Sequence, residues 1–388
     1  MQLTHTGFVV RDAIPLPAPG TTVRAAAQRS DAYAVRITTA FEPALDALSA
    51  LVADRSVAIL TDETVEALYA PALVRRLRAA GADPLVRAVP PGEGSKSLRR
   101  ACGLWDWLAS SELARRDVLL NFGGGVIADL GGWVASAYMR GLPYVNMPTT
   151  LLAQVDGALG GKVAVNHPSA KNLLGAFHQP IGVVANVGFL RSTSARHMRA
   201  GLAEAIKKAV IASPELWSFI DERAEAILGG DLEALERLVC AAAAIKTELI
   251  ARDPYEADLR RPLNYGHTVG HPVETLSAYD GSVLHGEAVA FGMVVETRIA
   301  AARGWTEPWL LEGVIDLLRR CRLPTRAADL RTALDGRALV AAMDKVRQIR
   351  AGSLRYVLPV ALGETVIADD VSEAELAAAL EASGVAMR

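Results

Sequence analysis

The chain has 388 residues, of which 51% are hydrophobic and 22% are charged, and its formal net charge is −2 at pH 7. This composition is typical of a globular protein, and the length predicts more than one domain. The small net charge excludes a whole-protein field that would attract nucleic acid or an anionic membrane surface. Any anionic ligand therefore has to be bound by a local cluster of cations.

Cysteine usage and apolar segments set expectations about compartment and partners. The three cysteines are far apart and include no CxxC pair, so we expect no disulfide framework, no thiolate zinc site and a reduced, cytoplasmic setting. The N-terminus has no basic start followed by an apolar run, so no signal peptide is expected. The apolar stretch 287–302 is interrupted by Glu296 and Arg298, which argues against a membrane span. We expect neither nucleic acid nor a membrane among the partners.

The first half of the chain has the pattern of an α/β domain. Residues 1–35, rich in Pro, Ala and Arg from residue 11 onward, are expected to form an N-terminal arm. Residues 36–190 alternate short apolar runs with amphipathic helical patterns, which predicts a Rossmann-like domain with a parallel sheet. The predicted strands are 56–62, 84–90, 117–123, 143–148 and 182–187.

The second half, residues 191–388, has the pattern of a mostly α-helical domain. Strand signals nearly vanish, and long amphipathic patterns such as 232–253 and 307–324 replace them. The exception is a late pair of predicted strands at 354–360 and 364–369. We expect the active site to lie between the two domains.

A run of glycines follows the strand at 117–123. Gly124 and Gly125 would let the backbone approach a pyrophosphate at the start of a helix, where N–H groups are unpaired. The usual dinucleotide fingerprint also requires an acid after the next strand, and none stands there. Asp62 and Glu93, however, follow other strands and could bind ribose hydroxyls. These features together favour dinucleotide binding, and the alternative is that the glycines only form a tight turn.

Two further segments carry clustered polar residues. Residues 148–180 place several Lys, Asn and Asp residues among glycines, which predicts a polar loop. Its composition is suited to binding a phosphate or polyol, and the alternative is a polar surface loop without a ligand. In the next helical pattern, Glu204 precedes Lys207 and Lys208 by one turn. Such a group is usually an exposed salt bridge. Because Ala and Ile surround it, burial of at least one charge is the alternative.

Histidines provide the candidate metal ligands. His267 and His271 are one helical turn apart, but Thr268 stands where the zinc-protease motif needs Glu, so that motif is excluded. A catalytic zinc site takes three protein ligands and leaves one position open. Glu204, His267 and His285 could form such a set from three helices. Their spacing alone does not establish it, since a lone His near a helix start is more often a cap or a core residue.

Six segments together resemble the sugar phosphate cyclases, a family typified by 3-dehydroquinate synthase. The resemblance runs in unbroken order through residues 55–365 and implies a dehydroquinate synthase-like fold. The segments are GGGVIADLGGWVASAYMRG, PTTLLAQVDGALGGKVAVN, KNLLGAFHQP, GLAEAIKKA, RRPLNYGHTVGH and LHGEAVAFGM.

The resemblance implies a homodimer with tightly bound NAD⁺ in the first domain and Zn²⁺ or Co²⁺ in the second. The metal ligands fall on Glu204, His267 and His285. The implied substrate and catalytic residues are Lys162, Asn172, Lys207, Asn264, His271 and Lys345, with Lys246 and Arg260 at the positions that hold a carboxylate, and Arg140 from a neighbouring subunit. On the cofactor side the resemblance implies Lys96, Asp129, Thr149, Thr150 and Asp156. The expected cofactor residues also include Lys171 and the residues of the strand and glycine pattern, Asp62, Glu93, Gly124 and Gly125.

The implied reaction converts a seven-carbon sugar phosphate to a carbocycle by transient oxidation, phosphate elimination, re-reduction and intramolecular aldol closure. The chain departs from the dehydroquinate synthase pattern, and the spacing within residues 343–359, which include Lys345, is stretched by about two residues. The departures are Ala128 for a glycine, Gly157-Ala158 for a serine pair, Asn186 for an acid, and Pro272 after His271.

Segments 32–38, 194–201 and 368–376 look more like the sedoheptulose 7-phosphate cyclases of secondary metabolism, although those enzymes often lack the second histidine. We therefore expect sedoheptulose 7-phosphate to be converted to a 2-epi-valiolone-type C7 cyclitol. The alternatives are 3-dehydroquinate synthase and a non-catalytic NAD- or sugar-phosphate-binding sensor. Glycerol-type alcohol dehydrogenases share the fold but lack the lysine cluster.

Overall fold

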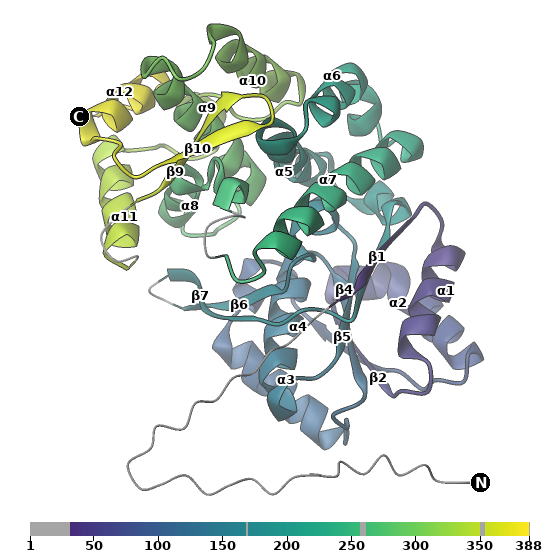
Figure 1. Ribbon diagram of the computed structural model, residues 1–388. Helices are drawn as coiled ribbons and strands as arrows, with labels where there is room; N and C mark the ends of the chain where they lie inside the picture. The colour runs from purple at the N-terminus through teal and green to yellow at the C-terminus, as the bar shows by residue number, and fades with distance from the viewer. Residues whose placement is uncertain (1–31, 168–169, 257–260, 350–353, 388) are drawn as a thin grey trace, which may run out of the picture. The chain divides into compact units, whose positions relative to one another are not determined.

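The computed structural model of the protein describes residues 32–167, 170–256, 261–349 and 354–387 (Figure 1). Most of the predicted N-terminal arm, residues 1–31, lies outside the described residues, as do the side chains of 261 and 345–349. Within Tyr33–Arg388, which form one compact unit, the sheet-containing part comes first and the helical part second.

A six-stranded, fully parallel sheet confirms the predicted Rossmann-like half. Its order is β1-β8-β5-β4-β2-β3, and all five predicted strands belong to it. The predicted arm ran to residue 35, but β1 begins at Ala34 and pairs with β8, so the sheet takes up the end of that segment. The strands are β1 (Ala34–Thr38), β2 (Val57–Asp62), β3 (Leu85–Val89), β4 (Val118–Gly123), β5 (Tyr144–Pro148) and β8 (Gly182–Asn186).

Helices cover both faces of this sheet, which explains why its central strands are apolar throughout. The side chains of α1 and α2 pack on one face, and those of α3 and α4 pack on the other. The chain reverses its direction across the sheet between β2 and β4, the point where ligands of such folds usually bind. These helices are α1 (Phe41–Val52), α2 (Glu63–Ala79), α3 (Leu98–Ser110) and α4 (Gly125–Ala137).

The segment predicted as a polar loop contains an antiparallel hairpin, β6 (Lys162–His167) with β7 (Ala170–Phe177). The loop prediction was wrong here because Asn and Gly have low strand propensity, and pairing with a partner strand outweighs that preference. Val163 and Val165 of the hairpin are buried in the core beside α3 and α4. Lys162 and Asn172 of the hairpin are exposed.

The second half is helical, as predicted, with one small hairpin formed by β9 (Tyr356–Ala361) and β10 (Glu364–Ala368). Helices α5 and α9 are buried over most of their length and form the centre of this half. The helices are α5 (Ala195–Ala212), α6 (Pro214–Leu228), α7 (Leu232–Arg252), α8 (His267–Leu276), α9 (His285–Ala302), α10 (Pro308–Arg320), α11 (Gly336–Ile349) and α12 (Glu373–Ala382).

Short helical turns connect these elements. Over the described part of the chain, none of the helices has the length and apolar character required to cross a lipid bilayer. The turns are η1 (Glu93–Ser95), η2 (Tyr138–Arg140), η3 (Ala153–Gly157), η4 (Val187–Ser192), η5 (Arg261–Asn264) and η6 (Ala327–Asp329).

Candidate active site

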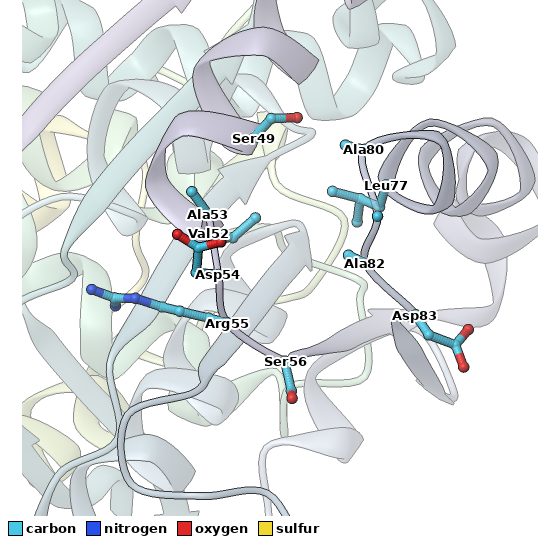
Figure 2. Close-up of a pocket in the computed structure, with 11 residues that line it drawn as sticks. Ser49, Val52, Ala53, Asp54, Arg55, Ser56, Leu77, Ala80, Ala82 and Asp83 are labelled. Carbon is cyan, nitrogen blue, oxygen red and sulfur yellow. The ribbon is translucent and has the colours of Figure 1, made fainter. Parts of the chain in front are cut away.

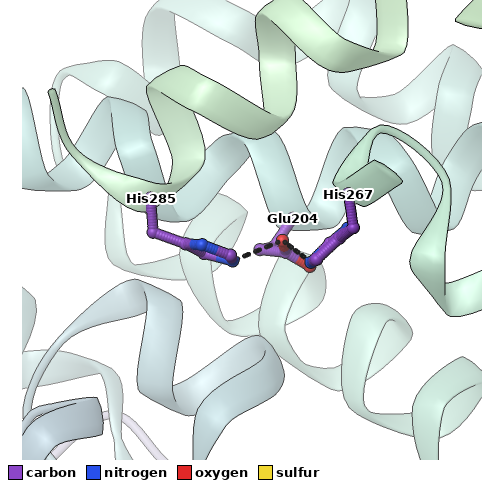
Figure 3. Close-up of side chains that lie close together, drawn as sticks. All are labelled: Glu204, His267 and His285. Carbon is purple, nitrogen blue, oxygen red and sulfur yellow. Dashed lines mark ion pairs between the residues drawn. The ribbon is translucent and has the colours of Figure 1, made fainter. Parts of the chain in front are cut away.

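Glu204, His267 and His285 come together from three different helices, as the sequence pattern allowed. Glu204 lies on the buried helix α5, while His267 and His285 are the first residues of α8 and α9. The Nε2 atoms of His267 and His285 lie 3.6 and 3.4 Å from the same Glu204 oxygen, Oε1 (Figure 3). Ligand atoms of all three residues lie within 4.8 Å of one another.

The hydrogen bonds of the two imidazoles orient them for metal binding. His267 Nδ1 lies 3.1 Å from the Tyr265 carbonyl oxygen, and His285 Nδ1 lies 2.9 Å from Glu274 Oε2. Because both partners can only accept, Nδ1 carries the proton of each neutral ring, the form that binds metal, and Nε2 is the ligand atom. Neither Glu204 oxygen accepts a regular hydrogen bond from the described residues. Three such ligands fit a catalytic divalent metal with an open position.

Charges around the cluster hold Glu204 ionised. Burial alone would raise the pKa of Glu204, but Lys207 outweighs burial and the pKa is well below its usual range. Burial lowers the pKa of His267, and Lys207 lowers it further. Burial would also lower the pKa of His285, yet Glu274 and Glu204 raise it to about 9.

Three buried lysines surround this cluster, so the buried-charge alternative is confirmed and the exposed salt bridge is wrong. Lys207 pairs with Glu204. Lys208 Nζ lies 2.8 Å from Asp156 Oδ1, and Lys246 Nζ lies 3.0 Å from Oδ2. Burial would raise the pKa of Asp156, but the lysines hold it well below its usual value. Asp156, predicted on the cofactor side, thus organises the lysines next to the candidate metal ligands.

His271 lies beside the metal cluster. Its ring centroid is 5.0 Å from that of His267 and 5.9 Å from that of His285. His271, Glu274 and His285 form a second group whose ligand atoms are close enough to hold a metal. The two groups share His285. The predicted phosphate contact of His271 stays a prediction.

Lys162 and Asn264, two predicted phosphate residues far apart in the sequence, bind the same carboxylate. Lys162 of β6 forms an ion pair with Glu256, and Asn264 Nδ2 donates to Glu256 Oε1 at 3.1 Å. Both side chains are therefore held where they bind an anionic oxygen group. Sequence reasoning missed Glu256, and no motif marks it.

The glycine-rich turn lies at the carboxyl edge of the sheet, at the reversal between β2 and β4. Gly124 caps α4, and a side chain on Gly125 would have no neighbour within 4 Å, so the backbone is accessible there. Thr149 donates its amide to the Gly123 carbonyl at 3.0 Å, and Thr150 packs against Gly124. Asp62 caps α2 by accepting from two of its amides. These residues fit a dinucleotide whose pyrophosphate meets the turn.

The other predicted cofactor residues form a chain of ion pairs on the same side. Lys96 is buried and bonds to Asp129 Oδ2 at 2.6 Å and to Asn172 Oδ1 at 2.5 Å. Lys171 lies 4.0 Å from Glu93 and 2.7 Å from Glu274. Asn172, predicted to bind phosphate, is thus positioned by a residue predicted on the cofactor side. Its phosphate role stays a prediction.

Three predicted residues are not placed with this group. Arg140 is exposed in η2 and has a positive φ of 66°. Arg260 and the Lys345 side chain lie outside the described residues. Glu274, which contacts His285, was missed, although its position three residues after His271 puts it on the same face of α8.

A hollow at the opposite edge of the sheet carries no comparable chemistry. It lies between the end of α1 and the end of α2, and its lining includes Asp54, Arg55 and Asp83. Figure 2 shows the Arg55 and Asp83 side chains pointing away from each other rather than converging on a ligand. The candidate active site is therefore the cluster centred on Glu204.

The comparisons with known proteins agree with this fold. A solved structure of ValA, the 2-epi-5-epi-valiolone synthase of Streptomyces hygroscopicus subsp. jinggangensis 5008 with NAD⁺ and Zn²⁺ bound, has a TM-score of 0.86 and 28% identity. The match covers 93% of this chain and 99% of that chain. Fold and site together define a dehydroquinate synthase-like protein.

Sequence comparisons identify the family. The profiles for the N-terminal and C-terminal parts of 3-dehydroquinate synthase match residues 86–200 and 201–347. The chain is 52% identical to the 2-epi-valiolone synthase of Actinosynnema mirum, over 96% of this chain and 98% of that protein. It is 41% identical to the 3-dehydroquinate synthase of Desulforamulus reducens, over 84% and 90%. The chain belongs to the sugar phosphate cyclase family, in its valiolone synthase branch.

Proposed function

We propose that this protein is a sugar phosphate cyclase that converts sedoheptulose 7-phosphate to 2-epi-valiolone, with NAD⁺ and Zn²⁺ or Co²⁺ as cofactors. The observation that carries the proposal is the convergence of Glu204, His267 and His285 next to three buried lysines. We infer the product from the relative with 52% identity, which is a 2-epi-valiolone synthase. The 2-epi-5-epi-valiolone synthase is less similar, with 28% identity.

The chain supplies both cofactor sites from its own residues. Glu204, His267 and His285 would hold the metal, and the turn at Gly124 and Gly125 would hold the NAD⁺ pyrophosphate. When bound, NAD⁺ accepts and returns a hydride, and the metal provides a Lewis acid. The protein has to bind and orient the sugar phosphate and keep water away from it.

Lys162 and Asn264 support a phosphate site. In this structure both bind the Glu256 carboxylate. A phosphate monoester offers the same kind of acceptor oxygen with more charge, so it can replace Glu256 as their partner. Lys207 and His271 lie near the Glu204 cluster and would complete the site. Lys162 and Lys207 would stabilise the negative charge that gathers on phosphate as it leaves.

The surroundings of Lys246 favour a polyol over a keto acid substrate. Lys246 Nζ already donates to the Asp156 carbonyl oxygen at 2.7 Å and lies 3.0 Å from Asp156 Oδ2. Lys246 thus already has acceptor oxygens within the protein and does not require a substrate carboxylate as its partner. A hydroxyl can still accept from Lys246 and donate to Asp156. The alternative function, that of a 3-dehydroquinate synthase, is supported by the 41% identity to the enzyme of Desulforamulus reducens.

The test offers the purified, NAD⁺- and Zn²⁺-loaded protein sedoheptulose 7-phosphate and the keto acid phosphate precursor of dehydroquinate separately. Phosphate release and the NMR spectrum of the product are followed, with His285→Ala as the inactive control. We expect turnover of sedoheptulose 7-phosphate alone, and NMR should assign the configuration of 2-epi-valiolone. Turnover of only the keto acid phosphate would make the protein a 3-dehydroquinate synthase. Binding of both compounds without phosphate release would indicate a sensor.

We also propose a cytoplasmic homodimer in which Arg140 completes the site of the neighbouring subunit. Its exposed position in η2 supports a contact with another chain. The three free cysteines are compatible with a reducing compartment. The domain division proposed from the sequence is an arm (1–35), an NAD-binding domain (36–190) and a metal- and substrate-binding domain (191–388).

A further inference from the structure

A buried carboxylate, Glu274, connects the candidate metal cluster to the cofactor side. It lies on α8, and its side chain is only 5% exposed. One oxygen, Oε2, accepts from His285 Nδ1 at 2.9 Å. The other, Oε1, accepts from Lys171 Nζ of β7 at 2.7 Å. Both oxygens of one carboxylate are thus used by residues on opposite sides of the site.

The bond to His285 determines which ring nitrogen faces Glu204. A carboxylate accepts but does not donate, so it keeps the imidazole proton on Nδ1. In the neutral ring, the form that binds metal, Nε2 then carries the lone pair and lies 3.4 Å from Glu204 Oε1. A carboxylate behind a metal-binding imidazole also increases the electron density on the ligand nitrogen.

Lys171 holds Glu274 in place. Its ammonium group lies between Glu274 and Glu93, at 2.7 and 4.0 Å, and 5.4 Å from the centroid of the Tyr279 ring. Burial would raise the pKa of Glu274, but His285 and Lys171 hold it well below its usual range. Burying an unpaired carboxylate is unfavourable, and the ion pair with Lys171 offsets part of the desolvation cost of Glu274.

We propose that Glu274 is a positioning residue that fixes His285 for metal binding and that Lys171 acts on the metal through Glu274. The proposal rests on the proposed metal site and adds to it a defined link from hairpin β6–β7 to α9. The same contact makes metal affinity depend on a residue that belongs to the NAD-binding half of the chain.

The test measures zinc affinity of the NAD⁺-loaded protein by competition with a chromophoric chelator. Glu274→Gln keeps an acceptor oxygen but removes the charge, and Glu274→Leu removes both. We expect zinc affinity to fall about 10-fold in Glu274→Gln and up to about 100-fold in Glu274→Leu, the range for partners of metal-binding histidines. Lys171→Met should lower affinity in the wild-type background and have little further effect in Glu274→Leu.

A matched control separates positioning from a loss of fold stability. Glu375→Gln removes a carboxylate that binds Arg303 and caps α12, away from the cluster. It should lower the melting temperature and leave zinc affinity unchanged. The Co²⁺-loaded Glu274 variants should bind one metal per site, with a shifted visible spectrum.

Three results would overturn the inference. Unchanged zinc affinity in Glu274→Leu would leave Glu274 a purely structural residue. Complete metal loss in Glu274→Gln, equal to that in Glu204→Gln, would make it a ligand, as the group of His271, Glu274 and His285 permits. Additive effects of Lys171→Met and Glu274→Leu would break the proposed link. If the wild-type protein itself bound no metal, the proposed function would fail instead.

Discussion

Lys246 shows how burial changes the chemistry of a single side chain. Its pKa is lowered to about 8, because burial opposes the charge more strongly than Asp156 supports it. The ammonium form therefore dominates below pH 8 and is lost as the pH rises through that value. Only this form offers a charged donor to a substrate oxygen, and the neutral amine is a much weaker one.

We predict that kcat/KM for the sugar phosphate decreases as the pH rises through about 8. Lys246→Met should have lower activity throughout and should lose this alkaline decrease, since the titrating group is gone. The measurement is phosphate release at low substrate concentration across the pH range. An identical alkaline decrease in Lys246→Met would assign the titration to another group.

Helices α5 and α9 pack closely against each other, and this packing requires glycine at the contact. Gly286 follows the candidate ligand His285, and a Cβ there would lie 1.8 Å from the Ala200 carbonyl oxygen of α5. The two helices carry Glu204 and His285, so their separation sets the distance between two ligands. Gly292 on α9 is similarly close to the Gly266 carbonyl oxygen, just before His267.

We predict that Gly286→Ala lowers the free energy of unfolding by about 1–3 kcal/mol, as overpacking does, and also weakens zinc binding. Gly103→Ala on α3 is the control, because nothing lies within 4 Å of the added Cβ. That variant should gain about 1 kcal/mol of stability from helix propensity alone. Urea unfolding and chelator competition measure the two effects. Wild-type zinc affinity in Gly286→Ala would show that the helices adjust without moving the ligands.

At the level of the assembly, the proposed homodimer would share its active sites through Arg140. Arg140 and Met139 are both at positive φ in an exposed turn after α4, a conformation that costs free energy unless a partner compensates. In a symmetric dimer each subunit would give its Arg140 and receive the other's.

We predict that Arg140→Ala and His285→Ala are each inactive alone but recover activity when co-expressed. A mixed dimer would contain one site with both residues intact, so random pairing should restore about a quarter of the wild-type activity. Absence of any recovery, with mixed dimers demonstrated by tagging, would mean that Arg140 serves its own subunit. A monomer in light scattering would rule out the arrangement altogether.

Sequence patterns alone predicted the parallel sheet, the helical half and the candidate metal ligands. Apolar runs separated by amphipathic patterns predicted the parallel sheet and the helical half, because burial requires those periodicities locally. The motif resemblance selected Glu204, His267 and His285 before any geometry was known. The secondary-structure prediction from local patterns failed at β6 and β7, where residues of low strand propensity are held by pairing with a partner strand.

The partners of these residues follow from the tertiary structure and not from local sequence patterns. Glu256 with Lys162 and Asn264, and Glu274 with His285 and Lys171, are contacts that no local pattern encodes. Burial of Lys207, Lys208 and Lys246 likewise depends on how α5, α7 and the turn at Asp156 pack together. Periodicity reports which face of an element is apolar, whereas the charge state and the hydrogen bonds of a side chain depend on elements distant in the sequence.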